Sequence, residues 1–187
     1  TQVFRAELRE SFEIAGGVAH AHEGVFVRLR LADATVGYGE ASPLPAFNSE
    51  TSRGSLSAIR RASRLWLGED GSAWRARLMA LEEALPRGAG AARASLGMAL
   101  LDAWTRRAGL PLRALFGGAQ SRLASDVTVT ILPPEAAAAS ARRIRALGVR
   151  KVKIKVGKDP QFADPQVPAD SFFFSQSNST LRRPICS

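Results

Sequence analysis

The sequence predicts an α+β domain followed by the first strand–helix–strand unit of an α/β sheet or barrel. Three observations lead to this fold class. Strand-like alternation dominates residues 2–40, helical periodicity dominates residues 55–107, and after Gly118 the pattern changes to strand, helix, strand. The 187 residues, 45% of them hydrophobic, are enough for one domain and a fraction of a second.

The N-terminal strands are predicted from their alternation of apolar and polar residues. Residues 2–13 alternate loosely, residues 24–31 form the clearest strand of this half, and residues 36–40 follow a short turn. Short connections between consecutive strands favour antiparallel pairing. We therefore predict a three-stranded antiparallel meander, with residues 14–23 and 42–50 as loops.

Three helices are predicted from the spacing of apolar side chains at about 3.6 residues. They cover residues 55–66, 73–85 and 89–107, and the last ends at Gly109, a residue type favoured just after a helix. Their leucine and aromatic side chains are best explained as packing residues of a core.

The strand–helix–strand unit comprises a strand at 126–131, a helix at 136–147 that Pro133 and Pro134 introduce, and a strand at 150–156. Two strands joined through a helix run parallel, with a right-handed crossover. Such a pair is a fragment of a larger α/β sheet or barrel and not a finished domain.

The second of these strands holds a cluster of lysines in a chain whose other basic residues are all arginines. All four lysines lie within residues 151–158. Alternation places lysines on one face and aliphatic residues on the other: Lys151, Lys153 and Lys155 against Val152, Ile154 and Val156. A lysine amine can lose its proton, whereas a guanidinium stays charged, so the cluster indicates a need for an amine. A solvated face of a half-buried strand is the alternative.

Composition excludes several classes of protein. The net charge of +9 could indicate an acidic partner, but the arginines are spread along the chain without interleaved aromatic residues, so we expect no nucleic acid. The single Cys186 cannot form an internal disulfide. We expect a cytoplasmic protein without a membrane partner, since no run approaches about 18 apolar residues and no leader pattern is present.

An ordered set of segments resembles the enolase superfamily, within it the muconate-lactonizing/mandelate-racemase type, and most of all its dipeptide epimerases. The resemblance covers roughly residues 3–158. The segments that carry it are the helix Ala-Arg-Ala-Ser-Leu-Gly-Met-Ala-Leu-Leu-Asp-Ala-Trp at 92–104, Gly-Leu-Pro-Leu at 109–112, Leu-Phe-Gly-Gly at 115–118, the Thr-rich strand, and Lys-Ile-Lys-Val-Gly at 153–157.

The resemblance implies three parts: a capping domain at 1–116, the start of a modified TIM barrel at 117–158, and an unmatched, disordered tail at 159–187. Active sites of such barrels lie at the carboxyl ends of the strands. Lys153 and Lys155 are then expected to point inward near the mouth of the barrel.

The resemblance also assigns roles. Lys155 is expected to be the base that removes the proton alpha to a carboxylate, and Lys153 its electrostatic partner, because a second ammonium disfavours charging of its neighbour. Thr128 matches a position that contacts substrate, although it is equally an ordinary strand residue. His20 and His22 are expected in a loop, solvated and not catalytic.

The implied cofactor is Mg²⁺, which the family holds with Asp, Glu and Asp at the ends of the third, fourth and fifth barrel strands. These strands have no match in the sequence, whose composition after Lys158 turns to Ser and Phe. A truncated or frame-shifted reading and a genuine disordered tail both account for this change.

We therefore expect the N-terminal part of a Mg²⁺-dependent dipeptide epimerase, inactive by itself. The expected partner is a small carboxylate substrate such as a dipeptide, selected by the loops at 14–23 and 42–50, and the complete enzyme is expected to be a homo-oligomer. The alternatives are a fragment of a muconate cycloisomerase or of an o-succinylbenzoate-synthase-like enzyme, or a non-catalytic remnant.

Overall fold

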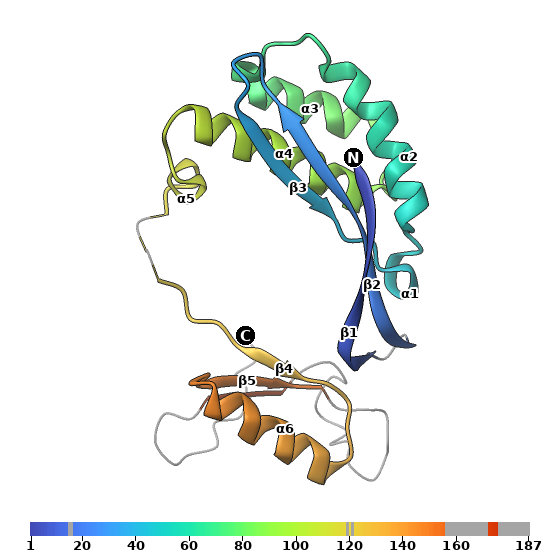
Figure 1. Cartoon of the computed structure of the whole chain (residues 1–187), viewed down its shortest axis with the longest axis vertical. Coiled ribbons are helices and arrows are strands. Elements are labelled where there is room, and N and C mark those ends of the chain that lie inside the picture. Colours follow the sequence, from blue (N-terminus) through green and yellow to red (C-terminus); the bar gives the residue numbers. More distant parts are fainter. Residues whose placement is uncertain (15–16, 119, 121, 156–171, 176–187) are drawn as a thin grey trace, which may run out of the picture. The chain divides into compact units, whose positions relative to one another are not determined.

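The computed structural model describes residues 1–14, 17–118, 120, 122–155 and 172–175 (Figure 1). The chain divides into two compact units. The first comprises Thr1–Arg9 and His20–Ser121, and the second comprises Glu10–Ala19 and Arg122–Ser187. No helix in the described part of the chain combines the length and the apolar composition needed to cross a lipid bilayer.

The N-terminal sheet has the order β1-β2-β3, with β1 at Gln2–Ile14, β2 at Gly17–Arg30 and β3 at Val36–Ala41. β2 and β3 pair antiparallel, with Val27 opposite Gly39. The predicted meander is therefore confirmed.

The loop predicted at residues 14–23 is wrong for most of its length, because β2 already begins at Gly17. This part of β2 contains Gly, Ala and His, which have low strand propensity, and Val18 and His20 are exposed. A strand that no second layer covers needs no apolar alternation, since its backbone hydrogen bonds hold it in the sheet. The alternation expected of a half-buried strand was therefore missing.

The two faces of the N-terminal sheet differ sharply. Val25 and Val27 of β2 are buried, whereas Phe26, Arg28 and Arg30 are exposed. Successive residues of a strand point to opposite faces, so one face meets the helices and the other does not.

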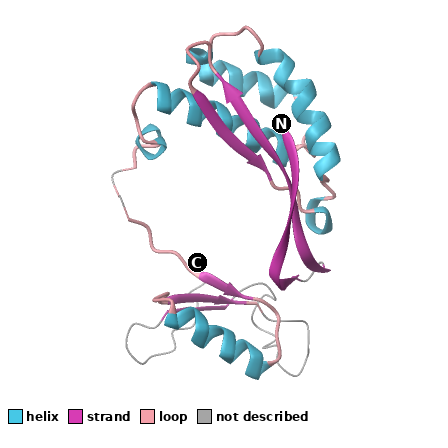
Figure 2. Ribbon diagram, in the orientation of Figure 1, coloured by secondary structure: helices cyan, strands magenta, loops and turns pink. Residues whose placement is uncertain are grey.

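The helices of the first unit pack on the buried face (Figures 1 and 2). The three predicted helices are confirmed. The helical segments are α1 at Pro45–Asn48, α2 at Ser52–Ser63, the 3₁₀ turns at Arg64–Trp66 and Gly71–Ala73, α3 at Trp74–Ala84, α4 at Gly90–Arg107 and α5 at Leu112–Leu115.

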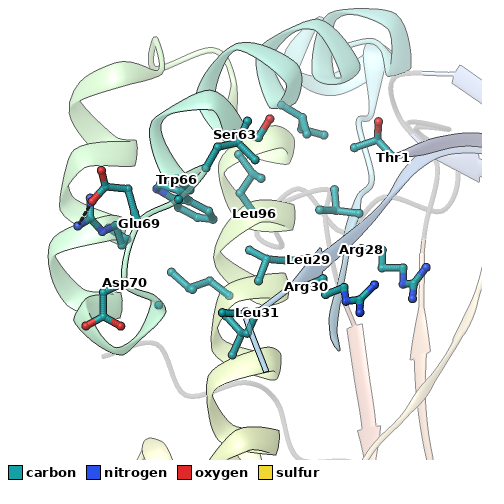
Figure 3. Close-up of a pocket in the computed structure, with 18 of the residues that line it drawn as sticks. Thr1, Arg28, Leu29, Arg30, Leu31, Ser63, Trp66, Glu69, Asp70 and Leu96 are labelled. Atoms are coloured by element: carbon teal, nitrogen blue, oxygen red, sulfur yellow. Dashed lines mark ion pairs between the residues drawn. The ribbon is translucent and has the colours of Figure 1, made fainter. Parts of the chain in front are cut away.

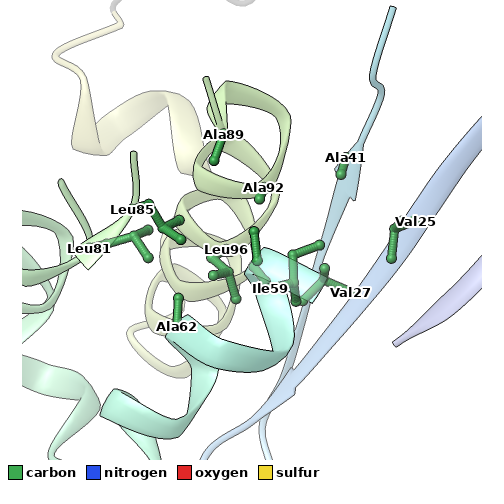
Figure 4. Packing of buried hydrophobic residues seen from close by; sticks show 12 residues of the cluster. Val25, Val27, Ala41, Ile59, Ala62, Leu81, Leu85, Ala89, Ala92 and Leu96 are labelled. Atoms are coloured by element: carbon green, nitrogen blue, oxygen red, sulfur yellow. The ribbon is translucent and has the colours of Figure 1, made fainter. Parts of the chain in front are cut away.

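The core of this unit joins the sheet to α2, α3 and α4. Val25 and Val27 from β2 meet Ile59, Leu81 and Leu96 from the three helices, and each of these side chains is at most 3% exposed (Figure 4). At roughly 25 cal/mol per Å² of buried apolar area, this cluster is the main source of stability in the unit.

Two features position α4. A Cβ atom at Gly37 or Gly39 of β3 would collide with the helix backbone, at the carbonyl oxygens of Ala99 and Ser95 respectively. Glycine at both positions therefore lets the helix lie directly on the strand. At the start of the helix, the Glu50 carboxylate accepts hydrogen bonds of 2.8 Å from the backbone N–H groups of Gly90 and Ala91. These bonds satisfy two donors that lack partners inside a helix.

The second unit contains the predicted strand–helix–strand arrangement, which is confirmed. β4 at Val127–Val129 and β5 at Lys151–Ile154 pair parallel, and α6 at Pro134–Ala146 connects them. Val156 lies outside the described residues.

A fourth element, β6 at Phe172–Ser175, pairs antiparallel with β5. These four residues were expected in a disordered tail, so that expectation is wrong for them; the rest of residues 159–187 lies outside the described part. The reason is that β5 leaves an open edge of backbone N–H and C=O groups, and phenylalanine favours strands.

Candidate active site

The parallel register of β4 and β5 sets two of the predicted site residues side by side. Thr128 lies opposite Lys153, and Val129 lies opposite Ile154. Val129 is 1% exposed, and β4 is in contact with α6, where Ile144 is also buried. Thr128 and Lys153 therefore share the face that points away from this small core.

Lys155 continues the same face. Its backbone N–H donates a 2.9 Å hydrogen bond to the carbonyl oxygen of Val129, which extends the parallel ladder beyond the end of β5. Two residues along a strand are about 6.6 Å apart, so the side chains of Lys153 and Lys155 start as close neighbours. Both are partly buried, whereas Lys151 is exposed. The three predicted site residues thus lie together.

An aromatic ring lies beside Lys155. The ammonium nitrogen Nζ of Lys155 is 4.6 Å from the centroid of the Phe12 ring. Phe12 belongs to β1 and to the same compact unit as the lysines. At this distance the face of the ring attracts the ammonium. Sequence reasoning missed Phe12, because the loose alternation of residues 2–13 shows nothing of a contact 143 residues further along the chain.

The segment that carries Phe12 has a charge unlike the rest of the chain. Residues 10–19 include Glu10 and Glu13 and no Arg or Lys, although the whole chain has 26 basic residues. The described cation–π contact places one positive charge beside Phe12, that of Lys155.

The two histidines belong elsewhere. His22 lies within β2 and not in a loop, and its Nε2 is 3.1 Å from a carboxylate oxygen of Glu40. Its ring meets that of Phe4 edge to face, at 5.5 Å between centroids. His20 is exposed on the same strand.

A cavity of about 720 Å³ lies apart from β5, the strand that carries the lysines. It lies within the first unit, where Leu29, Leu31 and Trp66 form apolar walls and Glu69 makes a 2.6 Å ion pair with Arg77 (Figure 3). None of the three predicted site residues lines it.

Comparison with known proteins agrees with this architecture. Residues 1–117 match the family model described as mandelate racemase/muconate lactonizing enzyme, N-terminal domain. The chain is 43% identical over 148 residues to an aromatic dipeptide epimerase of Herpetosiphon aurantiacus. The aligned residues make up 79% of this chain and 41% of the relative. It is 34% identical over 153 residues to an L-Ala-D/L-Glu epimerase of Bacillus subtilis, covering 81% and 42%. The chain thus spans about two fifths of the length of these relatives.

Solved structures give the same answer for the fold. A substrate-liganded L-Ala-D/L-Glu epimerase of Bacillus subtilis superposes with a TM-score of 0.80 at 33% identity, over 84% of this chain and 44% of that one. A dipeptide epimerase of Enterococcus faecalis, complexed with Mg and the dipeptide L-Leu-L-Tyr, superposes with a TM-score of 0.79 at 29% identity, over the same shares.

Proposed function

The chain belongs to the mandelate racemase/muconate lactonizing enzyme family, and we propose that it supplies the capping domain and the first two barrel strands of a dipeptide epimerase. The resemblance predicted from the sequence is confirmed. The observation that carries the proposal is the parallel register that sets Thr128 beside Lys153, with Lys155 next on the same face. The domain bounds 1–116, 117–158 and 159–187 stay predictions.

The proposed chemistry is proton removal at the carbon alpha to the substrate carboxylate. The C–H bond breaks, its proton goes to Nζ of Lys155 in the unprotonated form, and the electron pair is delocalised into the carboxylate; the ammonium that results is the form that the Phe12 ring attracts. The ammonium of Lys153 stabilises that added negative charge. Thr128, which lies opposite Lys153 in the parallel register, would contact the substrate. A proton donated to the opposite face of the carbon by an acidic group on the remaining barrel strands would complete the epimerisation.

Mg²⁺ is present in solved structures of related dipeptide epimerases. Among the described residues of this chain, however, no group of three or more His, Cys, Asp or Glu side chains could hold a metal ion. The described residues therefore do not fit a metal site, and the chemistry above uses only their own side chains.

The surroundings of Lys155 favour an apolar substrate side chain. The Phe12 ring, 37% exposed, offers an apolar surface beside the base. Dipeptides with an aromatic or aliphatic residue are thus proposed as better substrates than L-Ala-L-Glu. Relatives named aromatic and hydrophobic dipeptide epimerases, 43% and 36% identical, support this choice.

The test of function replaces Lys155 with Arg in an enzyme that joins this segment to the remaining barrel strands. The change keeps the positive charge but removes the base, so alpha-proton exchange should fall by about 10²–10⁴-fold. Deuterium incorporation into L-Ala-L-Phe, followed by NMR, measures it. Lys151→Arg, at an exposed position of the same strand, is the matched control and should keep its rate. Equal rates for both variants would show that Lys155 is only structural.

A companion measurement uses the 187-residue polypeptide alone. We expect no exchange above the protein-free rate with either L-Ala-L-Phe or L-Ala-L-Glu in the presence of Mg²⁺. A hard cation needs several oxygen ligands, and the described residues offer no such cluster. Exchange by the isolated chain would contradict this expectation.

A further inference from the structure

The outer face of the N-terminal sheet, opposite the helices, carries a cluster of aromatic rings. Phe26 and Tyr38 are each 43% exposed, and their ring centroids are 6.0 Å apart. The Phe4 ring lies 6.4 Å from that of Phe26 and crosses β2 at Gly24, where an added Cβ would be only 2.7 Å from the ring. Large aromatic side chains are the residues most enriched at protein interfaces.

Charges on this face are arranged around the aromatic pair. The antiparallel register sets Phe26 opposite Glu40 and Arg28 opposite Tyr38, so these four residues form the corners of one rectangle on the sheet. The two rings occupy one diagonal, and Arg28 and Glu40 occupy the other. This rectangle therefore has one cationic and one anionic corner about an aromatic centre. Two more cations lie beside it: Arg30 follows Arg28 on the same face, and the Arg106 guanidinium of α4, paired with Asp102, is 5.9 Å from the centroid of the Tyr38 ring.

Both charges have bonding capacity left. Arg28 is exposed and makes no ion pair with another described residue. Glu40 has a side chain 42% exposed, and His22 bonds only its Oε1, which leaves the second carboxylate oxygen without a partner among the described residues.

We propose that this face binds a second copy of the chain through a two-fold axis that lies along the Phe26–Tyr38 diagonal. A surface that binds its own copy must be self-complementary under a two-fold rotation. Rotation about this diagonal sets each ring against its own equivalent and brings Arg28 against the partner's Glu40, and the reverse. The inference is independent of the proposed catalytic function.

The geometry of the pairing follows from the spacing of a sheet. Neighbouring strands are about 4.8 Å apart and two residues span about 6.6 Å, so the diagonal lies roughly 35° from the strands. Rotation about it crosses the strands of the two sheets at roughly 70°, which is close to the orthogonal class of sheet packing. Two aromatic-bearing sheets can therefore pack face to face without breaking any hydrogen bond in either sheet.

The test is the oligomeric state of the 187-residue chain by sedimentation velocity at roughly 50 µM, where a specific interface of moderate affinity is populated by mass action. We expect a dimer that weakens with added salt. Arg28→Glu and Glu40→Arg should each weaken it by roughly tenfold or more, because like charges then meet across the axis. The double variant R28E/E40R exchanges the corners and should recover the dimer to within roughly threefold.

The matched control is Arg53→Glu, an equal charge change at an exposed position of α2. It should leave the dimer unchanged, and far-UV circular dichroism of every variant should match the parent. Three results would overturn the proposal: a monomeric parent chain, equal effects of Arg28→Glu and Arg53→Glu, or no recovery in the double variant. A monomer whose Phe26 and Tyr38 are protected from oxidation would show that the chain's own second unit covers the face.

Discussion

The first unit contains an antiparallel sheet with several helices, and the second contains a parallel strand pair with the single described helix α6. The two units nevertheless bury very different amounts of apolar surface. The first unit packs three helices against one face of its sheet, around Ile59, Leu81 and Leu96. In the second unit, Val129 and Ile144 are the only buried hydrophobic residues among those described. The difference shows that the stability of such a unit depends on the layer of helices that covers the sheet, and less on the strands themselves.

The contrast extends to the main helix of each unit. At its first turn, α4 donates two backbone N–H hydrogen bonds to the Glu50 carboxylate, and it buries residues along its whole length. α6 begins at Pro134 without a side-chain cap bond and buries only Ser140 and Ile144. β5, which carries Lys151 and Lys153, therefore follows a helix that makes few buried contacts.

The largest expected effect removes the close contact of the first unit. Gly39→Ala places a methyl group against the Ser95 carbonyl oxygen, and neither backbone can yield without moving the helix. We expect a loss of at least about 3 kcal/mol in the free energy of unfolding. Thermal unfolding followed by circular dichroism measures it. Gly88→Ala, where an added Cβ meets nothing within 4 Å, is the control and should change stability by less than about 0.5 kcal/mol.

Hydrogen exchange tests the comparison directly. Amides of α4 should exchange at least about 10²-fold more slowly than those of β4, α6 and β5, because few buried contacts oppose opening of the second unit. Mass spectrometry of peptides from the purified chain resolves the two regions. Slow exchange through Lys151–Ile154 in a monomer, at the rate of α4, would contradict the ranking.

A smaller effect isolates the helix cap. Glu50→Ala removes both hydrogen bonds at the start of α4 and should cost about 1–2 kcal/mol, with Glu50→Gln intermediate because one acceptor oxygen remains. Urea denaturation gives the free energy. Glu83→Ala, an exposed glutamate of α3, is the matched control. Identical midpoints for the Glu50 and Glu83 variants would show that the cap contributes nothing.

The smallest effect concerns acid. The hydroxyl and the backbone N–H of Ser72 hydrogen bond to the Asp70 carboxylate and hold its pKa below the ordinary value. A carboxyl group whose pKa is lower in the folded state stabilises the folded protein at pH values above the unfolded pKa of about 3.9. This contribution is lost as the pH falls through the folded-state pKa. Ser72→Ala should raise the pKa of Asp70 toward its ordinary value in an NMR titration. An unchanged titration curve would rule out the hydroxyl as a cause.

Periodicity sufficed for the elements that are amphipathic over several turns or residues. The helices at 55–66, 73–85 and 89–107 and the alternation of Lys153 and Lys155 with their aliphatic neighbours were predicted because one side of each element is apolar. The first part of β2, residues 17–23, was not predicted as a strand. These residues pair with β1 through backbone atoms and need no apolar pattern. Phe12 was missed for the same reason: its place beside Lys155 depends on how far that hairpin extends.

The antiparallel pairing of β6 with β5 bears on reconstitution of a split enzyme. A third barrel strand would have to join β5 in the parallel direction, along the edge that Phe172–Ser175 occupies. A separate polypeptide carrying the remaining strands must therefore displace β6 before it can dock. Complementation between two fragments should accordingly proceed faster when the first fragment ends at residue 158 than when it extends to residue 187.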